Sequence, residues 1–351
     1  MSGGVDSSLA AALLREQGYD LIGVTVRGWT PPWHSGEDGD KSCCSLAAVE
    51  DARAVAQQLD IPFYVLNFAD AFYHDIVEPF AATYLAGRTP NPCVACNRHI
   101  RFDRLYRKAR ELECDAVATG HFARLQYEHG RWQLLRGVDQ SKDQSYMLYT
   151  ASQEALAMTL YPLGNMTKAE VRKEAALRKL PTASRPESQD ICFVPDGNYT
   201  GLIEALHPGE IRPGPIYHVG GSMLGQHQGL CHHTIGQRRG LGLAWTEPLY
   251  VVGFDIDRNA LIVGEQSHLY QQDFQVEDVH WIAWPKLVGT HAVQVKIRYG
   301  ANPVEGQISE GEHGRCLVHL LQPQRAIAAG QAAVFYDGDV VLGGGTIVPA
   351  G

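Results

Sequence analysis

A run of small and hydroxyl-bearing residues opens the chain and leads directly into a helical pattern. Residues 2–8 read SGGVDSS, and residues 9–14 read LAAALL. Paired glycines let successive backbone N–H groups face one concavity, serines add hydroxyl donors, and a helix N-terminus carries partial positive charge. The run therefore predicts a loop that binds a phosphate group.

The residue types in this loop limit which class of phosphate-binding loop it can belong to. Asp6, Ser7 or Ser8 could act only as a cap of the first helix, as such residues often do. No Lys-Ser or Lys-Thr pair follows the glycines, so the loop is not a Walker P-loop, whose lysine reaches the β- and γ-phosphates. The run instead resembles the PP-loop, SGGxDS, of enzymes that use ATP to adenylate a substrate oxygen and release pyrophosphate.

The position of the loop is unusual. In doubly wound folds a phosphate loop follows a buried strand that fixes its place, but only Met1 precedes Ser2. We therefore expect an N-terminal domain without its first strand, because the recorded chain is cut short or its start is misassigned, or else a loop supported from elsewhere.

Composition places the chain among globular proteins. It has 351 residues, 45% hydrophobic and 20% charged, which is ordinary for two or three globular domains. No apolar run reaches the roughly 18 residues of a membrane span, and the N-terminus lacks a signal-peptide pattern. We expect a cytoplasmic protein.

Cysteine usage and charge also limit the function. The eight cysteines, at positions 43, 44, 93, 96, 114, 192, 231 and 316, are too sparse and irregular for a secreted disulfide scaffold, which favours reduced thiols, some with a chemical role. The net charge of −9 argues against a protein that coats nucleic acid nonspecifically, while a local basic surface stays possible.

Helical and strand patterns alternate from the loop to about residue 200. This order predicts a parallel, doubly wound α/β domain whose ligand lies at the carboxyl ends of the strands. Residues 28–46 form a long polar excursion, predicted to fold over the site or to be mobile. The predicted helices are 9–17, 47–59, 70–85 and 100–112, and the predicted strands are 21–26, 62–68 and 116–119.

After about residue 200 the pattern changes to glycine punctuation and short β-rich runs. We expect residues 1–201 to form the α/β domain and residues 202–268 a small mixed central domain. Residues 269–351 are predicted to form a C-terminal antiparallel β-barrel.

Two cysteine segments stand out from the rest of the chain. Residues 89–97 read TPNPCVACN and predict a proline-ordered loop with two thiols, while residues 187–193 read ESQDICF and add a third. Sulfur transfer needs thiols on ordered backbone with a lowered pKa, because the thiolate is the nucleophile. Cys114, Cys231 and Cys316 are better explained as small buried hydrophobic residues.

Several ordered motifs accompany the loop and the cysteines, over nearly the whole chain. With them the chain resembles the tRNA-specific 2-thiouridylases (the MnmA/TrmU family), which convert the wobble uridine of certain tRNAs to 2-thiouridine. The motifs read NPCVACN at 91–97, TGH at 119–121, KDQSY at 142–146, DICF at 190–193, HTIGQRRGLG at 233–242 and PQRAIAAGQAAVFYDG at 323–338.

The resemblance implies a role for each motif. Cys192 would carry the transferable sulfur as a persulfide, and Cys96 would be its catalytic partner. ATP, with Mg²⁺, would contact Ser2, Gly3, Gly4, Val5, Asp6, Ser7, Ser8, Val26 and Gly120. The tRNA would contact Asn91, Pro92, Cys93, His121, Lys142, Asp143, Gln144, Arg298, Tyr299 and Gln331.

One position departs from the family pattern. An aspartate often stands where this chain has Cys93, so an acid or base role proposed for that aspartate does not carry over. Cys93, Cys96 and Cys192 could instead hold three irons of a [4Fe–4S] cluster whose fourth iron binds the donor sulfide. A zinc site is a weaker variant, because no fourth ligand is evident.

Two further function classes stay open. Other PP-loop enzymes adenylate a substrate to form a C–N bond and need no paired cysteines. A protein that binds tRNA with a failed ATP site is the non-enzyme alternative. If the chain is a tRNA thiouridylase, its expected partners are the anticodon loop of tRNA and a sulfur-donor protein, such as a cysteine desulfurase or a relay protein. The enzyme is then expected to be a monomer.

Basic residues near the thiols could serve tRNA binding. The predicted helix after Cys96 carries Arg98, Arg101, Arg104, Arg107, Lys108 and Arg110. Helical spacing places residues 101, 104 and 108 on one face. This face could be a solvated surface, but next to the thiols contact with tRNA phosphates is the better hypothesis. A second basic helix should begin after Thr167, which forms a capping box with Glu170.

Overall fold

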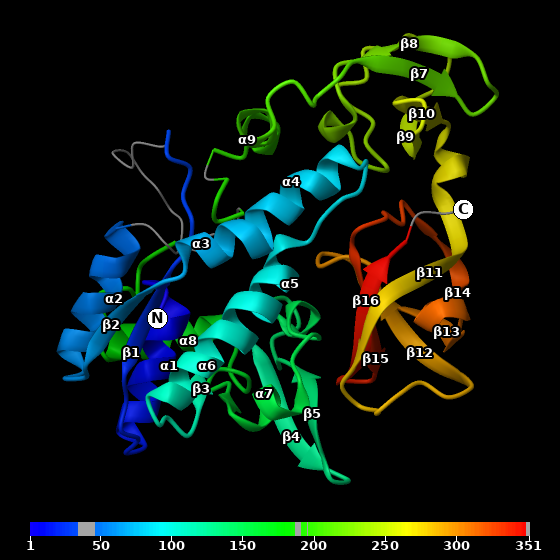
Figure 1. Cartoon of the computed structure of the whole chain (residues 1–351). Helices are drawn as coiled ribbons and strands as arrows, with labels where there is room; N and C mark the ends of the chain where they lie inside the picture. The colour runs from blue at the N-terminus through cyan, green and yellow to red at the C-terminus, as the bar shows by residue number, and fades with distance from the viewer. Residues whose placement is uncertain (34–45, 187–190, 195, 349–351) are drawn as a thin grey trace. The chain divides into compact units, whose positions relative to one another are not determined.

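The computed structural model describes residues 1–33, 46–186, 191–194 and 196–348, and the chain divides into two compact units (Figure 1). The first unit contains Met1–Val77, Pro92–Asn198 and Asp339–Val341. The second contains Glu78–Asn91, Tyr199–Gly338 and Leu342–Gly351. Most of the polar excursion predicted at 28–46, with its two cysteines, lies outside the described residues.

The first unit alternates helices and strands, as predicted. No helix among the described residues of the chain is both long and apolar enough to cross a bilayer. The helices are α1 (Val5–Glu16), α2 (Leu46–Gln58), α3 (Ala69–Phe72), η1 (Tyr73–Val77), α5 (Pro92–Cys96), η2 (Asn97–Leu105), α6 (Tyr106–Glu111), η3 (Ser145–Met147), α7 (Gln153–Ala157) and α8 (Lys168–Leu177). The strands are β1 (Gly23–Arg27), β2 (Phe63–Asn67), β3 (Val117–Ala118), β4 (Ala123–Glu128), β5 (Arg131–Arg136) and β6 (Thr159–Leu160).

Parallel pairing confirms the α/β class of this unit. β1 pairs with β2 from Gly23↔Phe63 to Arg27↔Asn67, and β3 pairs with β6, both in parallel. The start of the chain is fixed against β1, because the Met1 ammonium donates to the Val24 carbonyl and the Thr25 hydroxyl donates to the Met1 carbonyl at 2.7 Å. The loop thus leaves from a strand edge.

The hydrophobic core of the first unit joins α1 to α8. Leu9 of α1 and Val171 of α8 are both fully buried and belong to one cluster with Val55, Phe122 and Leu163. α1 presents its apolar side to this cluster and ends where predicted, with Gly18 at φ +86° just beyond its cap. Such a left-handed residue terminates a helix at low cost when it is glycine.

The stretch that carries Cys93 and Cys96 differs from the sequence prediction. The sequence predicts a loop up to residue 97 and a helix from residue 100, but the helical path begins at Pro92 and continues through α5, η2 and α6. Proline suits the first helical position, because its φ is preset and its missing N–H is not needed there. The middle part, η2, has the wide turns of a π-helix.

The sequence analysis did not predict the hairpin that follows β3. β4 and β5 form an antiparallel hairpin from Ala123↔Arg136 to Glu128↔Arg131, with His129 and Gly130 at positive φ in its turn. The backbone of Val340 and Val341 adds a further antiparallel pairing to β5.

The second unit is mostly β structure, as predicted. Its helical segments are α4 (Glu78–Leu85), α9 (Tyr199–Leu206), η4 (Leu230–His232), η5 (Gln266–Leu269) and η6 (Glu312–Gly314). Strands β7 (Gly214–His218), β8 (Met223–His227), β9 (Tyr250–Asp255) and β10 (Ala260–Gly264) form a mixed sheet in the order β8-β7-β10-β9.

The remaining strands close into a barrel, shown in yellow to red in Figure 1. β11 pairs with both β14 and β16, so that Val276 faces Cys316 on one side and Ile347 on the other. This closure confirms the antiparallel barrel and leaves none of its six strands as an open edge. The strands are β11 (Tyr270–Trp281), β12 (Thr290–Lys296), β13 (Val304–Glu310), β14 (Cys316–Arg325), β15 (Ala332–Asp337) and β16 (Val340–Ile347).

The predicted capping box at the start of α8 is confirmed and supports a prediction. The Thr167 hydroxyl accepts from the Glu170 N–H at 3.3 Å, and the Glu170 carboxylate accepts from the Thr167 N–H at 2.7 Å. Thr167→Ala should lower the free energy of unfolding by about 1 kcal/mol, because one N–H loses its acceptor. Urea unfolding of the whole chain measures this, with Thr167→Ser, which keeps the oxygen, as the control. Equal midpoints for the alanine and serine variants would contradict the capping role.

Candidate active site

The N-terminal loop is organised by its own hydroxyl groups. Ser7 and Ser8 donate to the Gly4 carbonyl at 3.2 and 2.9 Å, and the Ser2 N–H donates to the Ser7 hydroxyl at 3.0 Å. Within the described chain no side chain caps α1. The interpretation of these residues as a simple helix cap is therefore wrong: the hydroxyls bind a carbonyl, and no side-chain cap covers the positive end of the helix.

Two glycines allow the loop to pack closely. Gly3 has φ +70°, and a Cβ there would lie 2.4 Å from the Ala48 carbonyl oxygen. At Gly120 a Cβ would lie 2.7 Å from the Asp6 carbonyl carbon and the Ser7 nitrogen. Gly120, predicted from the resemblance to serve the same site as the loop, is thus in direct contact with it.

Val26 lies near the carboxyl end of β1, beside the parallel strand β2, where it pairs with Leu66. It is half-buried. Ligands of open α/β sheets bind outside the carboxyl ends of the strands. The position is therefore consistent with the adenine contact that the resemblance implies, and that contact stays a prediction.

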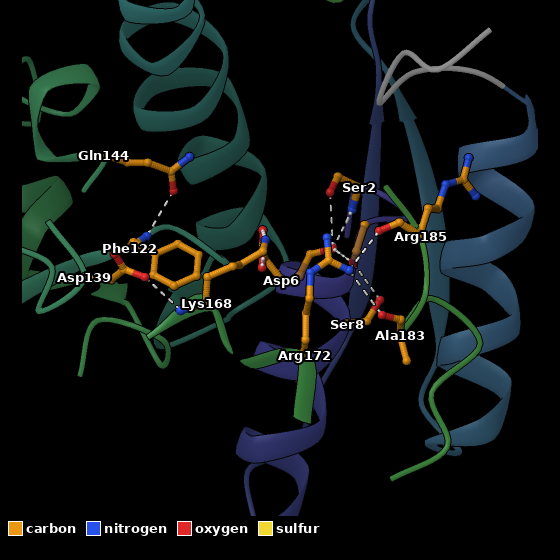
Figure 2. Close-up of polar contacts among 12 residues, drawn as sticks. Ser2, Asp6, Ser8, Phe122, Asp139, Gln144, Lys168, Arg172, Ala183 and Arg185 are labelled. Atoms are coloured by element: carbon orange, nitrogen blue, oxygen red, sulfur yellow. Dashed lines mark hydrogen bonds and ion pairs between the residues drawn. The ribbon is translucent and has the colours of Figure 1, made fainter. Parts of the chain in front are cut away.

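Lys168 is a residue of this site that sequence reasoning missed. Its ammonium donates to both Asp6 carboxylate oxygens, at 2.7 and 2.8 Å, and lies 5.5 Å from the centre of the Phe122 ring (Figure 2). Only 10% of its side chain is exposed, against 32% for Asp6. The signal in the sequence was the capping box, which places Lys168 at the first position of α8, but nothing linked that position to the loop.

Three of the predicted tRNA-contacting residues lie in the turn before η3. Asp143 is buried and accepts from the Gly137 and Ser145 N–H groups, each at 3.1 Å. The Gln144 amide oxygen accepts from the Phe122 N–H at 3.0 Å (Figure 2), and the Lys142 N–H donates to the Asp139 carbonyl at 3.0 Å. These contacts of Asp143 and Gln144 hold the fold together, and a tRNA contact by the segment stays a prediction.

His121 follows Gly120 at the end of β3. Its Nδ1 shares a hydrogen bond of 2.8 Å with the Thr119 hydroxyl, and its ring lies edge-on to Tyr161 at 6.1 Å. Burial, with a smaller contribution from the Arg101 charge, lowers the pKa of His121 to about 3. The imidazole is therefore neutral at physiological pH and can exchange hydrogen bonds with a ligand but not a charge.

Cys93 and Cys96 occupy consecutive turns of one short helix. Cys93 is exposed and Cys96 is half-buried. The Arg104 guanidinium on the same helical path binds the Asp75 carboxylate at 2.9 Å. α5 also packs directly on η1, which contains Asp75, so η1 fixes the position of the cysteine helix.

Cys192 lies in a turn closed by a hydrogen bond of 2.9 Å from the Val194 N–H to the Ile191 carbonyl. Its side chain is half-buried. Its neighbour Phe193 is buried and packs edge-on against Phe72 at 5.7 Å. Because Phe72 and Asp75 belong to the helical segment 69–77, this one segment anchors both cysteine-bearing parts of the first unit.

The geometry bears on a metal cluster. In the parts of the chain that the structure describes, no group of three His, Cys, Asp or Glu side chains is arranged to hold a metal ion. Cys93, Cys96 and Cys192 are all described, so the structure does not bring them together as cluster ligands. Residues Gln189 and Asp190, just before Cys192, lie outside the described residues.

The remaining predicted tRNA contacts belong to the second unit. The Gln331 amide donates to the Thr89 and Pro90 carbonyls at 3.2 and 3.1 Å, which orders the segment leading to Asn91. Arg298 is exposed, and Tyr299 is 42% exposed with the Lys296 ammonium 5.5 Å from its ring centre. A cation and an exposed ring together suit nucleic acid.

Family models match three consecutive parts of the chain. Residues 1–196 match a "tRNA methyl transferase HUP domain", residues 206–265 a "tRNA methyl transferase PRC-barrel domain", and residues 271–347 an "Aminomethyltransferase beta-barrel domain". The chain thus has a PP-loop class α/β domain followed by two β domains.

Curated relatives identify the family. A tRNA-specific 2-thiouridylase MnmA of Moorella thermoacetica is 52% identical over 99% of this chain and 98% of its own length. MnmA proteins of Symbiobacterium thermophilum and Clostridium perfringens are 50% and 46% identical, each over 99% of this chain and over 90% and 96% of their own lengths. The chain belongs to the MnmA family of tRNA-specific 2-thiouridylases.

Solved structures give weaker likenesses. A U34-tRNA thiolase NcsA of Methanococcus maripaludis, solved with its [4Fe–4S] cluster, is 21% identical over 60% of this chain and 65% of its own, with a TM-score of 0.35. An NMN synthetase of Francisella tularensis is 17% identical over 59% and 74%, with a TM-score of 0.33. Scores this low bear on neither the fold nor the site.

The depressed pKa of His121 leads to a second prediction. In the unfolded chain this imidazole should titrate near 6.5, but in the folded chain it titrates near 3. As the pH falls from about 6.5 toward 3, the unfolded state binds the proton first, so His121 makes the folded state progressively less stable. His121→Gln should flatten that part of the stability curve. NMR of ¹³C-labelled histidine, assigned with this variant, should show no inflection for His121 between pH 5 and 8; an inflection there would contradict the neutral imidazole.

Proposed function

We propose that this chain synthesises 2-thiouridine at the wobble position of tRNA, as a cytoplasmic sulfurtransferase that uses ATP. The observation that carries the proposal is that one helical segment, 69–77, anchors both the Cys96 helix and the Cys192 turn. The same unit holds the phosphate loop, with Gly120 and neutral His121 beside it. A nucleotide site and two thiols in one unit are what sulfur transfer to an activated carbonyl requires.

The chemistry explains why ATP is needed. A uracil carbonyl is a poor electrophile, because its oxygen is a poor leaving group. If O2 attacks the α-phosphorus of ATP, pyrophosphate leaves and the oxygen becomes part of an AMP leaving group. The N–H groups at the start of α1 would stabilise the charge that grows on the pyrophosphate.

Sulfur transfer then proceeds between the two cysteines. The terminal sulfur of a Cys192 persulfide attacks C2, and AMP leaves with the former O2. The Cys96 thiolate attacks the inner sulfur of Cys192, which breaks the S–S bond to the base and leaves 2-thiouridine and a Cys96–Cys192 disulfide. A cellular reductant must restore the thiols, and a sulfur-donor protein must reload Cys192.

Mg²⁺ accompanies ATP in most enzymes, usually bound by one or two carboxylates and the phosphates. The carboxylate of the loop, Asp6, is engaged by Lys168 through both of its oxygens. With both oxygens bound by the ammonium, Asp6 does not fit as a ligand of the ion. When bound with ATP, the ion would supply neutralisation of phosphate charge.

Binding of tRNA needs both positive charge and access to the base. The wobble uridine must leave its stack to meet ATP and a thiol, at a cost of a few kcal/mol. Arg98 and Arg107 are exposed on the helical path of Cys96. The three cations assigned to one face have different surroundings: Arg104 binds Asp75, Lys108 binds Glu111 at 2.8 Å, and Arg101 acts on His121.

A [4Fe–4S] carrier on Cys93, Cys96 and Cys192 is the alternative for the sulfur source. We propose the persulfide as the sulfur source, because transfer through two cysteines needs no metal ligands beyond them. The departure at Cys93, where the family often has aspartate, is the feature that keeps the cluster worth testing. Iron and acid-labile sulfide measured on active protein purified without air decide between them: stoichiometric iron that is lost in Cys93→Ser would overturn the persulfide.

Cysteine variants test the proposed reaction. Cys96→Ser and Cys192→Ser should each lower 2-thiouridine formation by about 10³-fold or more, because each removes an obligatory sulfur. Pyrophosphate release with cognate tRNA should continue, since adenylation precedes sulfur transfer. Mass spectrometry of digested tRNA and a pyrophosphate assay give the two readouts.

The matched control is Cys114→Ser, which should leave both readouts unchanged. The Cys114 thiol is partly exposed and not buried as expected from the sequence. Full product formation by both the Cys96 and the Cys192 variants would reject thiolation in favour of another PP-loop ligase. Binding of tRNA without any pyrophosphate release in the unaltered protein would favour the non-enzyme alternative.

A further inference from the structure

Lys168 occupies a position that is unfavourable for a lysine unless it has a function. Only 10% of its side chain is exposed, and burial disfavours the charged ammonium. It is also the first residue of α8, where the positive end of the helix dipole repels a cation. The hydrogen bonds to Asp6 at 2.7 and 2.8 Å offset part of these costs, but a purely structural contact could be made by an apolar residue.

A second ion pair joins the same two helices and shows what a purely structural link looks like. At the far ends of α1 and α8, the Arg178 guanidinium binds the Glu16 carboxylate at 2.7 and 2.8 Å. Both pairs span 162 residues, so the two helices run side by side in the same direction. Arg178 lies at a C-terminal end, where the dipole favours a cation.

The two pairs therefore differ in what surrounds them. At the Lys168 end, the first turn of α1, the hydroxyl-lined loop and the start of α8 are close together, because Asp6 belongs to that first turn (Figure 2). Two helix N-termini and the Lys168 ammonium bring positive charge to this end, and the Asp6 and Asp139 carboxylates, which accept from the Lys168 ammonium and from the Lys168 N–H at 2.9 Å, balance part of it. Asp6 holds the ammonium at the loop.

We propose that Lys168 is a phosphate-binding catalytic residue, whose ammonium contacts the triphosphate of ATP and stabilises the departing pyrophosphate, with Asp6 as the residue that positions it. Walker loops carry such a lysine within the loop sequence. This loop has none, and α8 supplies one from a distant part of the sequence. The inference rests on the proposed use of ATP at the loop and adds a residue that the sequence motif does not contain.

Methionine variants of the two cations form a matched test. Lys168→Met and Arg178→Met each break one ion pair between α1 and α8 and keep an unbranched apolar chain. Only Lys168→Met should weaken ATP binding, by about 10- to 100-fold, the range for a lost charge-assisted hydrogen bond. Calorimetric titration with ATP, and with inorganic pyrophosphate as a second probe, measures the affinities in the absence of tRNA.

Three further readouts separate this role from a structural one. Lys168→Arg should recover part of the pyrophosphate affinity, because it keeps the charge, and ATP-dependent pyrophosphate release should fall in Lys168→Met. Affinity for tRNA should stay unchanged. If Lys168→Met does not fold because Asp6 is left unpaired, the double variant Asp6→Asn with Lys168→Met removes both charges and should fold while still failing to bind pyrophosphate.

The outcomes are distinct. Equal losses of ATP affinity in Lys168→Met and Arg178→Met, or unchanged pyrophosphate binding in the folded double variant, would overturn the role of Lys168. If the unaltered protein binds ATP and pyrophosphate through Lys168 but forms no 2-thiouridine, this inference holds and the proposed function fails. If 2-thiouridine forms normally in Lys168→Met, the proposed function holds and this inference fails.

Discussion

The packing of α8 against α1 is the interaction on which the first unit depends. Leu9 and Val171 meet in the core, and an ion pair closes each end of the contact. α1 begins at the glycine-rich loop, so whatever fixes α1 also fixes the N–H groups at the start of that helix. Close contact between Gly120 and the loop then adds a second constraint from β3. The loop owes its shape to partners far away in the sequence.

The two cysteine-bearing parts of the first unit likewise depend on one shared segment. The segment 69–77 uses an apolar contact, Phe72 with Phe193, to hold the Cys192 turn and a charged contact, Asp75 with Arg104, to hold the Cys96 helix. The wide turns of η2 follow directly after Cys96, and such turns shift side chains around the helix relative to regular α spacing. Arg101, Arg104 and Lys108 therefore have different environments. A helical projection with 3.6 residues per turn places them on one face and does not predict this difference.

The sequence predicts correctly those features of the fold that residues close together in the chain determine. The Thr167–Glu170 capping box, the end of α1 before Gly18 and the parallel pairing of β1 with β2 all follow from short patterns. Prediction failed where a distant partner decides: Lys168 reads as an ordinary helix-start residue until Asp6 is known to face it. It also failed at Pro92, taken as part of a loop although proline is favoured at the first position of a helix. The β4–β5 hairpin could have been predicted from the sequence, because its His129-Gly130 turn is a local signal.

Resemblance to a family selects residues by motif and does not separate those that bind a ligand from those that hold the motif in shape. Asp143 shows the difference: it lies in the KDQSY motif, yet its carboxylate is buried and accepts from Gly137 and Ser145. Gln331 likewise orders the backbone before Asn91. His121 differs from both, because its neutral imidazole lies beside the loop and its Nδ1 is held by Thr119, which leaves Nε2 as the ring atom that can face a ligand. Motif residues whose polar atoms are already committed to backbone groups are therefore weaker candidates for substrate contact than those at the strand ends around the loop.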